Sequence, residues 1–260
     1  MDLAWQAGRI TLRHFQVGVE VDAKADGTPV TRADRDAERF LRDAIGARFP
    51  DDAVVGEEDE DRPGTSGRTW ILDPIDGTKA FVHGVPLYSV LVAVAFAEDP
   101  GASHPAPRVG VVHHPGLGET VSAYVNGGCW WNGRRAAVSP TTRLEDALVT
   151  TSDFPDHEQP VDLERLYAAA RLRRTWGDAY GYSMVATGRA DVMIDPIVAP
   201  WDVAAVIPIV EEAGGRFSSL DGRPGPWHGH GVATNGLLHD EVLELLPASV
   251  CSRPTQPATT

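Results

Sequence analysis

The chain has 260 residues and a mass of 27.9 kDa, which suits one large domain or two closely packed halves. Hydrophobic residues make up 42% and charged residues 23%, a composition that is typical of globular proteins and excludes a disordered or fibrous chain. The formal net charge of −14 repels nucleic-acid phosphates and anionic lipids, so we expect neither as a partner. The two cysteines, Cys129 and Cys251, form no CxxC pair, which argues against structural zinc or a disulfide framework.

The N-terminal residues contain Asp2, Arg9 and Arg13 and lack the apolar block of a signal peptide. The most apolar stretch, 85–97, is interrupted and too short for a membrane span of about 20 residues. The sequence therefore predicts a cytoplasmic protein that does not contact the membrane.

The N-terminal half is predicted to contain two helices followed by a series of strands. Apolar positions at helical spacing predict a helix over 2–15 and another over 32–48, which Thr31 or a neighbouring residue caps. Pro50 ends the second helix. Strands are expected at 53–55, 70–72, 89–96, 108–113 and 119–125.

From about residue 140, strands alternate with helices. We expect strands at 147–151, 190–195 and 216–219, and helices at 161–173, 180–188 and 201–213. Grouped strands with helices between the groups predict an α/β fold, layered in the α+β manner, with sheets covered by helices. The expected division is an N-terminal half (1–138), a C-terminal half (139–250) and a loose tail (251–260).

The sequence DPIDGT, which begins at Asp73, follows a predicted buried strand and presents two carboxylates, Asp73 and Asp76. The proline between them stiffens the turn, and Gly77 permits close backbone approach. Thr78 stands at a possible helix start, where its hydroxyl and backbone N–H groups would face an anion. Carboxylates beside an anion site indicate cations between them, although Asp-Pro and Asp-Gly are also ordinary turn dipeptides.

Three further acidic residues are candidates for the same site. Glu57 follows Gly56 at the end of a predicted strand and is either an oxygen ligand or part of a solvated acidic run. Asp202 opens an apolar helix, where it supplies a carboxylate or interacts with the helix dipole. Asp34 lies in a segment that begins at Thr31 and is also typical of a helix cap.

Together these segments resemble the inositol monophosphatase superfamily of magnesium-dependent phosphatases, over residues 1–245. The residues that carry the resemblance are GEE at 56–58, WILDPIDGT at 70–78, WD at 201–202, EAGG at 212–215, PVT at 29–31 and Asp34. The resemblance implies an αβαβα sandwich of alternating helix and sheet layers, and a homodimer. It places most metal ligands in the N-terminal half, and Asp202 with the specificity residues in the C-terminal half.

The resemblance also implies the roles of individual residues. The implied ligands of Mg²⁺, with Mn²⁺ as the alternative, are Glu57, Asp73, Asp76, Asp202 and the carbonyl of Ile75. Water activation falls to Glu57, Thr78 and Asp34, and the backbone amides of Gly77 and Thr78 would hold phosphate. The physics agrees, because paired divalent cations neutralise a phosphate monoester and lower the pKa of water, and oxygen ligands suit Mg²⁺ better than zinc.

Other catalytic motifs are weaker. Cys129 and Arg135 have the spacing of a cysteine phosphatase, but the intervening Trp130 and Trp131 would crowd a phosphate cradle. The spacing of Asp73 and Asp76 differs from the D-x-D-x-T pattern of aspartyl-phosphate enzymes. No nucleophile elbow, P-loop or H-E-x-x-H occurs, so the histidines are interpreted as surface or hydrogen-bonded residues.

Several positions resemble the histidinol-phosphate phosphatase branch of the superfamily in particular. They are the segments 175–182 and 185–191, and Asp195 with Pro196. Lys79 resembles both this branch and the 3′-phosphoadenosine-phosphatase branch. Histidinol phosphate carries an ammonium and an imidazole, which Asp178 and Asp195 would pair with. The residues assigned to substrate binding are therefore Gly77, Thr78, Gly177, Asp178, Ala179 and Asp195. Asp178 is also interpretable as the cap of a helix that begins near residue 180.

The sequence thus predicts a Mg²⁺-dependent phosphomonoesterase acting on a small phosphorylated substrate, L-histidinol phosphate, in histidine biosynthesis. Inositol-1-monophosphatase and nucleotide 3′-phosphatase are the alternatives within the class. A non-catalytic regulator that binds metal or phosphate is the alternative from a different class.

Overall fold

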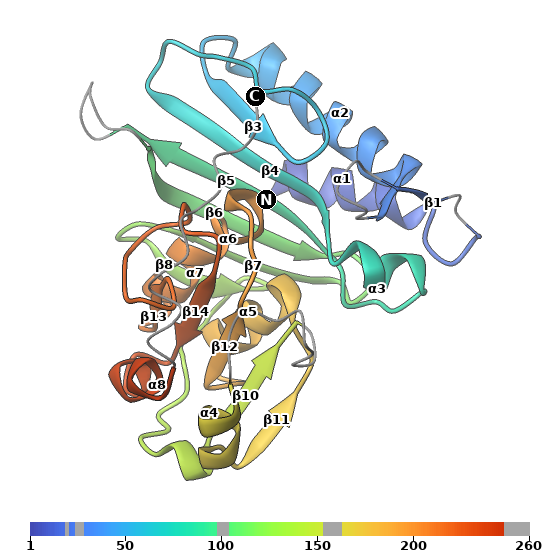
Figure 1. The fold of residues 1–260 in the computed structure, drawn as a ribbon. Coiled ribbons are helices and arrows are strands. Elements are labelled where there is room, and N and C mark those ends of the chain that lie inside the picture. Colours follow the sequence, from blue (N-terminus) through green and yellow to red (C-terminus); the bar gives the residue numbers. More distant parts are fainter. Residues whose placement is uncertain (19–20, 24–28, 98–103, 153–162, 247–260) are drawn as a thin grey trace.

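Helices and β-sheets alternate in layers through the molecule (Figure 1). The computed structural model describes residues 1–18, 21–23, 29–97, 104–152 and 163–246. Two helices form one outer layer, a seven-stranded sheet and a five-stranded sheet enclose further helices, and two short helices cover the far face. This order of layers confirms the α/β fold class and the expected αβαβα arrangement.

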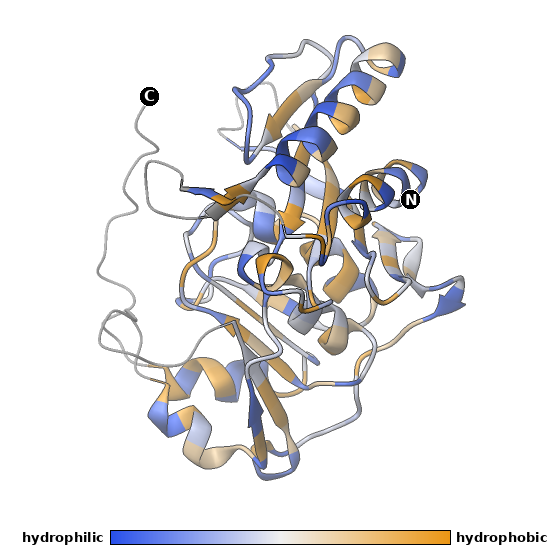
Figure 2. Ribbon diagram, turned by 90° about the vertical axis from the view of Figure 1, so that its right-hand side faces the viewer, coloured by the Kyte–Doolittle hydropathy of each residue, from blue (hydrophilic) through white to orange (hydrophobic). Residues whose placement is uncertain are grey.

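The first layer consists of α1 (Asp2–Leu12) and α2 (Arg32–Arg48), which pack together on the large sheet. Thr31 caps α2 as expected: its hydroxyl accepts the N–H of Ala33, and Asp34 accepts the N–H of Thr31. Helix α2 is amphipathic, and its hydrophilic and hydrophobic stripes are visible in Figure 2. Its apolar face joins a buried cluster with residues of α1 and the sheet.

The seven-stranded sheet follows the order of the sequence, β3-β4-β5-β6-β7-β8-β9. Its strands are β3 (Ala53–Gly56), β4 (Arg68–Asp76), β5 (Ser89–Phe96), β6 (Ala106–His114), β7 (Glu119–Tyr124), β8 (Gly128–Trp131) and β9 (Arg134–Arg135). The β3–β4 pair is parallel and the other pairs are antiparallel. A two-stranded ribbon, β1 (Val21–Ala23) with β2 (Pro29–Thr31), precedes α2, and the short α3 (Thr78–Val82) follows β4.

Three helices lie in the central layer: α5 (Asp178–Ala186), α6 (Pro200–Val203) and α7 (Val206–Glu212). Their apolar residues form the largest buried cluster with the inner faces of both sheets. The single helix predicted over 201–213 is wrong, because the structure has two helices there. Pro208 lacks the N–H that would bond the carbonyl of Ala204, so a continuous helix cannot form.

The second sheet has five strands in the order β11-β10-β12-β14-β13. They are β10 (Leu148–Thr151), β11 (Leu172–Arg174), β12 (Val192–Asp195), β13 (Arg216–Ser218) and β14 (Gly231–Thr234). Helices α4 (Glu164–Ala169) and α8 (His239–Leu245) cover its outer face around a separate apolar cluster, and a 3₁₀ turn, η1 (Leu144–Asp146), precedes β10.

The helix predicted over 161–173 is too long. In its described part α4 ends at Ala169, and β11 follows within the predicted range. The polar run of arginines at 171–174 gave no strand pattern, and β11 forms because its backbone pairs in parallel with β10. The short strands β1, β2, β8, β9 and β14 and the helix α8 were not predicted from the sequence.

The division into two halves remains a prediction. The large sheet ends at Arg135 and the small sheet begins at Leu148, while the expected tail lies outside the described residues. In the part of the chain that the structure describes, no helix has the length and apolar character needed to cross a membrane.

Candidate active site

The end of β4 positions the first two carboxylates, Asp73 and Asp76. β4 lies between β3 and β5, and its last six residues are all buried. Its pairing with β5 shifts register between Asp73 and Asp76, where Pro74 has no N–H to contribute to the ladder. The N–H of Ile75 donates instead to Asp73 Oδ1 at 3.0 Å, which fixes the direction of that carboxylate.

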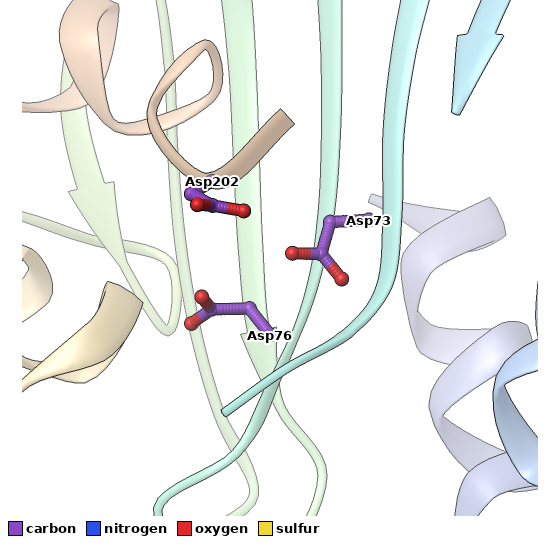
Figure 3. A group of neighbouring side chains, drawn as sticks. All are labelled: Asp73, Asp76 and Asp202. Atoms are coloured by element: carbon purple, nitrogen blue, oxygen red, sulfur yellow. The ribbon is translucent and has the colours of Figure 1, made fainter. Parts of the chain in front are cut away.

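Asp202 brings the third carboxylate from the first turn of α6, which packs against β4. Its Oδ2 accepts the N–H of Ala199 at 2.7 Å. One oxygen from each of Asp73, Asp76 and Asp202 lies within 4.8 Å of the others. The three side chains point toward a common centre (Figure 3). We call these three residues the carboxylate cluster.

The electrostatics of the cluster oppose three bare negative charges. Burial, followed by the charge of Glu57, raises the pKa of Asp73 well above its usual value. Burial and the neighbouring Asp178 do the same for Asp76, and burial raises the pKa of Asp202 to about 8. Such carboxylates are either protonated or paired with a cation.

Glu57 and Asp34 flank the carboxylate cluster. Glu57 follows Gly56, which pairs with Leu72, so Glu57 comes beside Asp73 across the parallel strands. Asp34 is buried, and burial is the main cause that raises its pKa to about 6, with a contribution from Glu57. Its Oδ2 accepts the N–H and O–H of Thr31, whereas Oδ1 is buried with no hydrogen-bond partner.

Thr78 begins α3 directly after the cluster. Its hydroxyl donates to the carbonyl of Ile75 at 3.1 Å, so the two groups expected to serve water and metal are adjacent. Gly77 has a φ of 82°, a left-handed conformation that favours glycine. The family resemblance assigns Asp34 and Thr78 together to water activation. Among the described residues the two are bonded to different groups, because the cap of α2 occupies Asp34 Oδ2.

Asp178 approaches the cluster from α5. A Cβ on Gly77 would lie 3.0 Å from Asp178 Oδ2, so the carboxylate lies directly against the glycine. The next residue, Ala179, donates its N–H to Asp76 Oδ2 at 2.7 Å and ties α5 to the cluster. Helix α5 begins at Asp178, with Gly177 as its N-cap and no side-chain cap bond. The helix thus begins two residues earlier than expected, at Asp178 itself, and the capping role of Asp178 stays a prediction.

Asp195 is buried at the end of β12, and the hydroxyl of Ser152 donates to its carboxylate. The same Ser152 oxygen accepts the N–H of Asp178 at 2.7 Å. Burial raises the pKa of Asp195 to about 7. Asp195 thus supports Asp178 through Ser152, a residue that the sequence analysis missed because a lone serine after a strand carries no distinctive pattern.

The competing nucleophile and the histidines are accounted for by packing. Cys129 is fully buried in the central core, and burial raises the pKa of its thiol to about 12, the opposite of what a cysteine nucleophile needs. His114 is buried between Ser89 and Ser183, whose hydroxyls lie 2.8 and 2.9 Å from its ring nitrogens. His114 is thus a hydrogen-bonded core residue, as interpreted from the sequence, and Cys129 is a core residue.

Comparisons with known proteins show which family the chain belongs to. The model of the inositol monophosphatase family matches residues 1–251. A histidinol-phosphatase of Chlorobaculum parvum is 44% identical over 240 residues, covering 90% of this chain and 89% of that protein. A histidinol-phosphatase of Mycobacterium tuberculosis is 41% identical and covers 95% of each. A Thermotoga maritima inositol monophosphatase superposes with a TM-score of 0.84 at 33% identity, covering 94% of this chain and 93% of that structure. The chain therefore belongs to the inositol monophosphatase family.

Proposed function

We propose that this chain is a metal-dependent phosphomonoesterase that hydrolyses L-histidinol phosphate to L-histidinol and phosphate. The observation that carries the metal-dependent chemistry is the carboxylate cluster, three oxygens within 4.8 Å from two separate segments of the chain. The observation that carries the substrate is the similarity to two histidinol-phosphatases at 41–44% identity over most of the chain.

The residues of the site fit a divalent cation. The charges that raise the pKa of Asp73 all come from carboxylates: Glu57, Asp76, Asp202 and Asp34. Asp34 Oδ1 adds a buried acceptor without a partner. A buried set of oxygen donors with this much negative charge requires positive charge for stability, and hard oxygen ligands favour Mg²⁺ or Mn²⁺.

In this proposal Asp73, Asp76 and Asp202 hold the cation together with Glu57 and the carbonyl of Ile75. When bound, a divalent cation would neutralise the phosphate and lower the pKa of the attacking water. The N–H groups of Ile75, Ala179 and Ala199 fix the orientation of the three carboxylates before any ligand arrives.

Thr78 and the acidic flank would position the water. The Thr78 hydroxyl donates its hydrogen to the Ile75 carbonyl. Its oxygen can therefore only accept a further hydrogen bond, and it would orient the attacking water by accepting one of the water's hydrogens. Glu57 and Asp34 Oδ1 would accept a hydrogen bond from the other hydrogen of the same water. The amides of Gly77 and Thr78 are proposed to hold the phosphate.

Asp178 is proposed to select the substrate. It lies against Gly77, so a phosphate ester bound there brings its alcohol portion close to this carboxylate. Histidinol carries an ammonium and an imidazole, and pairing with a carboxylate is stronger for these groups than for the hydroxyls of inositol. Gly177, Ala179 and Asp195 are assigned to the same substrate site.

The test is a panel of phosphomonoesters assayed with Mg²⁺ and with excess chelator. We expect the highest kcat/KM for histidinol phosphate, low values for inositol-1-phosphate and 3′-phosphoadenosine phosphate, and no activity in chelator. A preference for one of the other two esters would reassign the substrate. Failure to hydrolyse any of them with Mg²⁺ would favour the non-catalytic regulator. The homodimer and the cytoplasmic location stay predictions, which gel filtration and cell fractionation test.

A further inference from the structure

The acidic loop at 57–61, with sequence EEDED, begins with the candidate ligand Glu57 and is bound by two residues of α2. These are Glu38 and Arg42, one turn apart on the same helix face as Asp34. The Glu38 side chain is 0% exposed and the Arg42 side chain 14%, and Arg42 Nε donates to Glu38 Oε1 at 2.7 Å. A buried ion pair therefore lies directly beneath the loop.

Both members of the pair bond the backbone of the loop. Glu38 Oε2 accepts the N–H of Glu58 at 3.0 Å, and Oε1 accepts the N–H of Asp59 at 3.2 Å. Arg42 donates from its two terminal nitrogens to the carbonyls of Asp59 and Glu60, at 2.8 and 2.9 Å. Donors and acceptors of three successive residues after Glu57 are thus fixed by charge-assisted hydrogen bonds.

Gly56 shows how closely the pair fits. A Cβ at this position would overlap Glu38 Oε1 and lie 2.8 Å from Arg42 Nη2. Gly56 is also the last residue of β3 and pairs with Leu72. Glu57 is consequently bounded by the sheet on one side and by the loop that Glu38 and Arg42 hold on the other.

The loop requires such a restraint because its charge opposes its position. Five consecutive carboxylates lie next to a site that already contains Asp34, Asp73 and Asp202, each of which has its pKa raised in part by Glu57. Repulsion of this kind would displace a free loop outward. An ion pair bonded to the backbone holds the loop without adding net charge to the site.

We propose that Glu38 and Arg42 are positioning residues that keep Glu57 in place for the divalent cation. The inference rests on the proposed function only in that a divalent cation binds at the carboxylate cluster. It assigns these two side chains to cation affinity rather than to general stability or to contact with the substrate.

The test compares Mg²⁺ binding to the wild type, Glu38→Gln and Arg42→Met by isothermal titration calorimetry without substrate. Residues that support metal ligands typically change affinity by 10- to 100-fold, so we expect the Kd for Mg²⁺ to rise by about that factor in both variants. The matched control is Arg32→Met. Arg32 belongs to the same helix and forms the same type of pair four residues on, with Asp36, but it is exposed and does not bond the loop. Its Kd should be that of the wild type.

Steady-state kinetics supply a second readout. We expect the Mg²⁺ concentration for half-maximal activity to rise in Glu38→Gln and Arg42→Met by a larger factor than the KM for substrate, which should stay within about threefold of wild type. Wild-type Kd values in both variants, or an equal loss in Arg32→Met, would overturn the inference. If circular dichroism shows that these variants do not fold, Arg42→Lys decides, because it keeps the charge but loses the fork to two carbonyls. A wild-type Kd in Arg42→Lys then counts against the inference. If the wild-type protein binds Mg²⁺ but hydrolyses no ester, the proposed function is refuted. The role of Glu38 and Arg42 in Mg²⁺ binding is then decided by the calorimetric Kd values alone.

Discussion

Asp178 combines a rare backbone conformation with a charged side chain. Its φ of 51° is left-handed, which costs a residue other than glycine roughly 1 kcal/mol or more. The conformation persists because Ser152 accepts its N–H and the following N–H donates to Asp76. Strain that the surroundings maintain in this way is typical of functional positions, and here it directs a carboxylate toward Gly77.

The substitution Asp178→Asn tests the substrate assignment. It keeps the size of the side chain but removes the charge that would pair with the histidinol cation, and such losses cost ~2–5 kcal/mol when the pair is desolvated. Because Asp178 is partly exposed, we expect the lower end, an approximately 30-fold fall in kcat/KM for histidinol phosphate. Hydrolysis of p-nitrophenyl phosphate, which carries no cation, should barely change. Equal losses on both esters would mean that Asp178 serves the architecture of the site.

Asp73→Asn should separate activity from stability. The carboxylate is proposed to hold the cation, so we expect kcat to fall by about 10²–10³-fold or more. The same change removes a buried charge that four other carboxylates repel, so the metal-free variant should resist urea better than the metal-free wild type. Assays and urea titrations in chelator measure the two effects. A variant that is both active and less stable would contradict the assignment of Asp73 as a ligand.

At the scale of elements, one glycine sets the distance between the large sheet and the central helices. Gly110 lies in β6, and a Cβ there would overlap the carbonyl oxygen of Ala205, at the start of α7. Backbone atoms cannot move aside as a flexible side chain does. The close contact of β6 with α7 therefore depends on the absence of a side chain.

Gly110→Ala should destabilise the protein by roughly 2–3 kcal/mol, the upper part of the range for overpacking in a dense interior, because the added Cβ meets backbone atoms. The midpoint of urea unfolding in the presence of Mg²⁺ measures this loss. Gly118→Ala is the control for backbone conformation, because Gly118 has a φ of 62° and no atom within 4 Å of an added Cβ. A larger loss at Gly118 than at Gly110 would show that packing against α7 is loose.

Elements with local signals were predictable from the sequence, and elements formed by pairing were not. Thr31 and Asp34 form the cap that defines the start of α2, and a dense run of apolar residues identified β5. The strand β11 consists of arginines and a leucine, and it exists because β10 offers it a partner. The break between α6 and α7 follows from Pro208, a local signal that the apolar pattern of the helix concealed.

At the scale of the whole molecule, the metal-free protein buries several carboxylates close together, and their ionisation destabilises the folded state. Burial raises the pKa of Asp34 to about 6, of Asp195 to about 7 and of Asp202 to about 8. In each case the folded state binds a proton that the unfolded state has already lost. Stability from these groups is therefore complete at low pH and falls as pH rises through the folded-state pKa values.

We expect metal-free protein to lose about 2–4 kcal/mol of stability between pH 6 and pH 8, since one group contributes about 1.4 kcal/mol per pH unit. Urea unfolding in chelator at the two pH values gives the difference. His114 and His239 act in the opposite direction, because burial lowers their pKa values to about 3 and about 4 and stability rises until the unfolded histidine loses its proton at about pH 6.5. They offset part of the loss at the lower end of the window. Saturating Mg²⁺ should abolish or reverse the loss. Greater stability of the metal-free protein at pH 8 would contradict the repulsion described above.

The acidic residues proposed as ligands were predictable from the sequence, but the residues that hold the site in place were not. The acidic residues of DPIDGT, GEE and WD stand in short patterns that the chemistry requires, and the structure brings Asp73, Asp76 and Asp202 together. Glu38 and Ser152 lie in no such pattern. Their roles arise from the packing of α2 on β3 and of β10 on α5, which one sequence does not encode locally.

The distribution of the cluster along the chain has a consequence for biosynthesis. The large sheet is built from strands in sequence order and is complete at Arg135, whereas Asp202 follows after β10, β11 and β12, the parallel strands of the second sheet. A nascent chain emerging from the ribosome thus presents Asp73 and Asp76 long before their third partner. We expect a nascent chain of this length to hold these two carboxylates protonated or exposed, and the cell's Mg²⁺ to bind tightly only once the segment that carries Asp202 has been made. The cation would then bind after the large sheet has formed and would stabilise the contact between that sheet and α6.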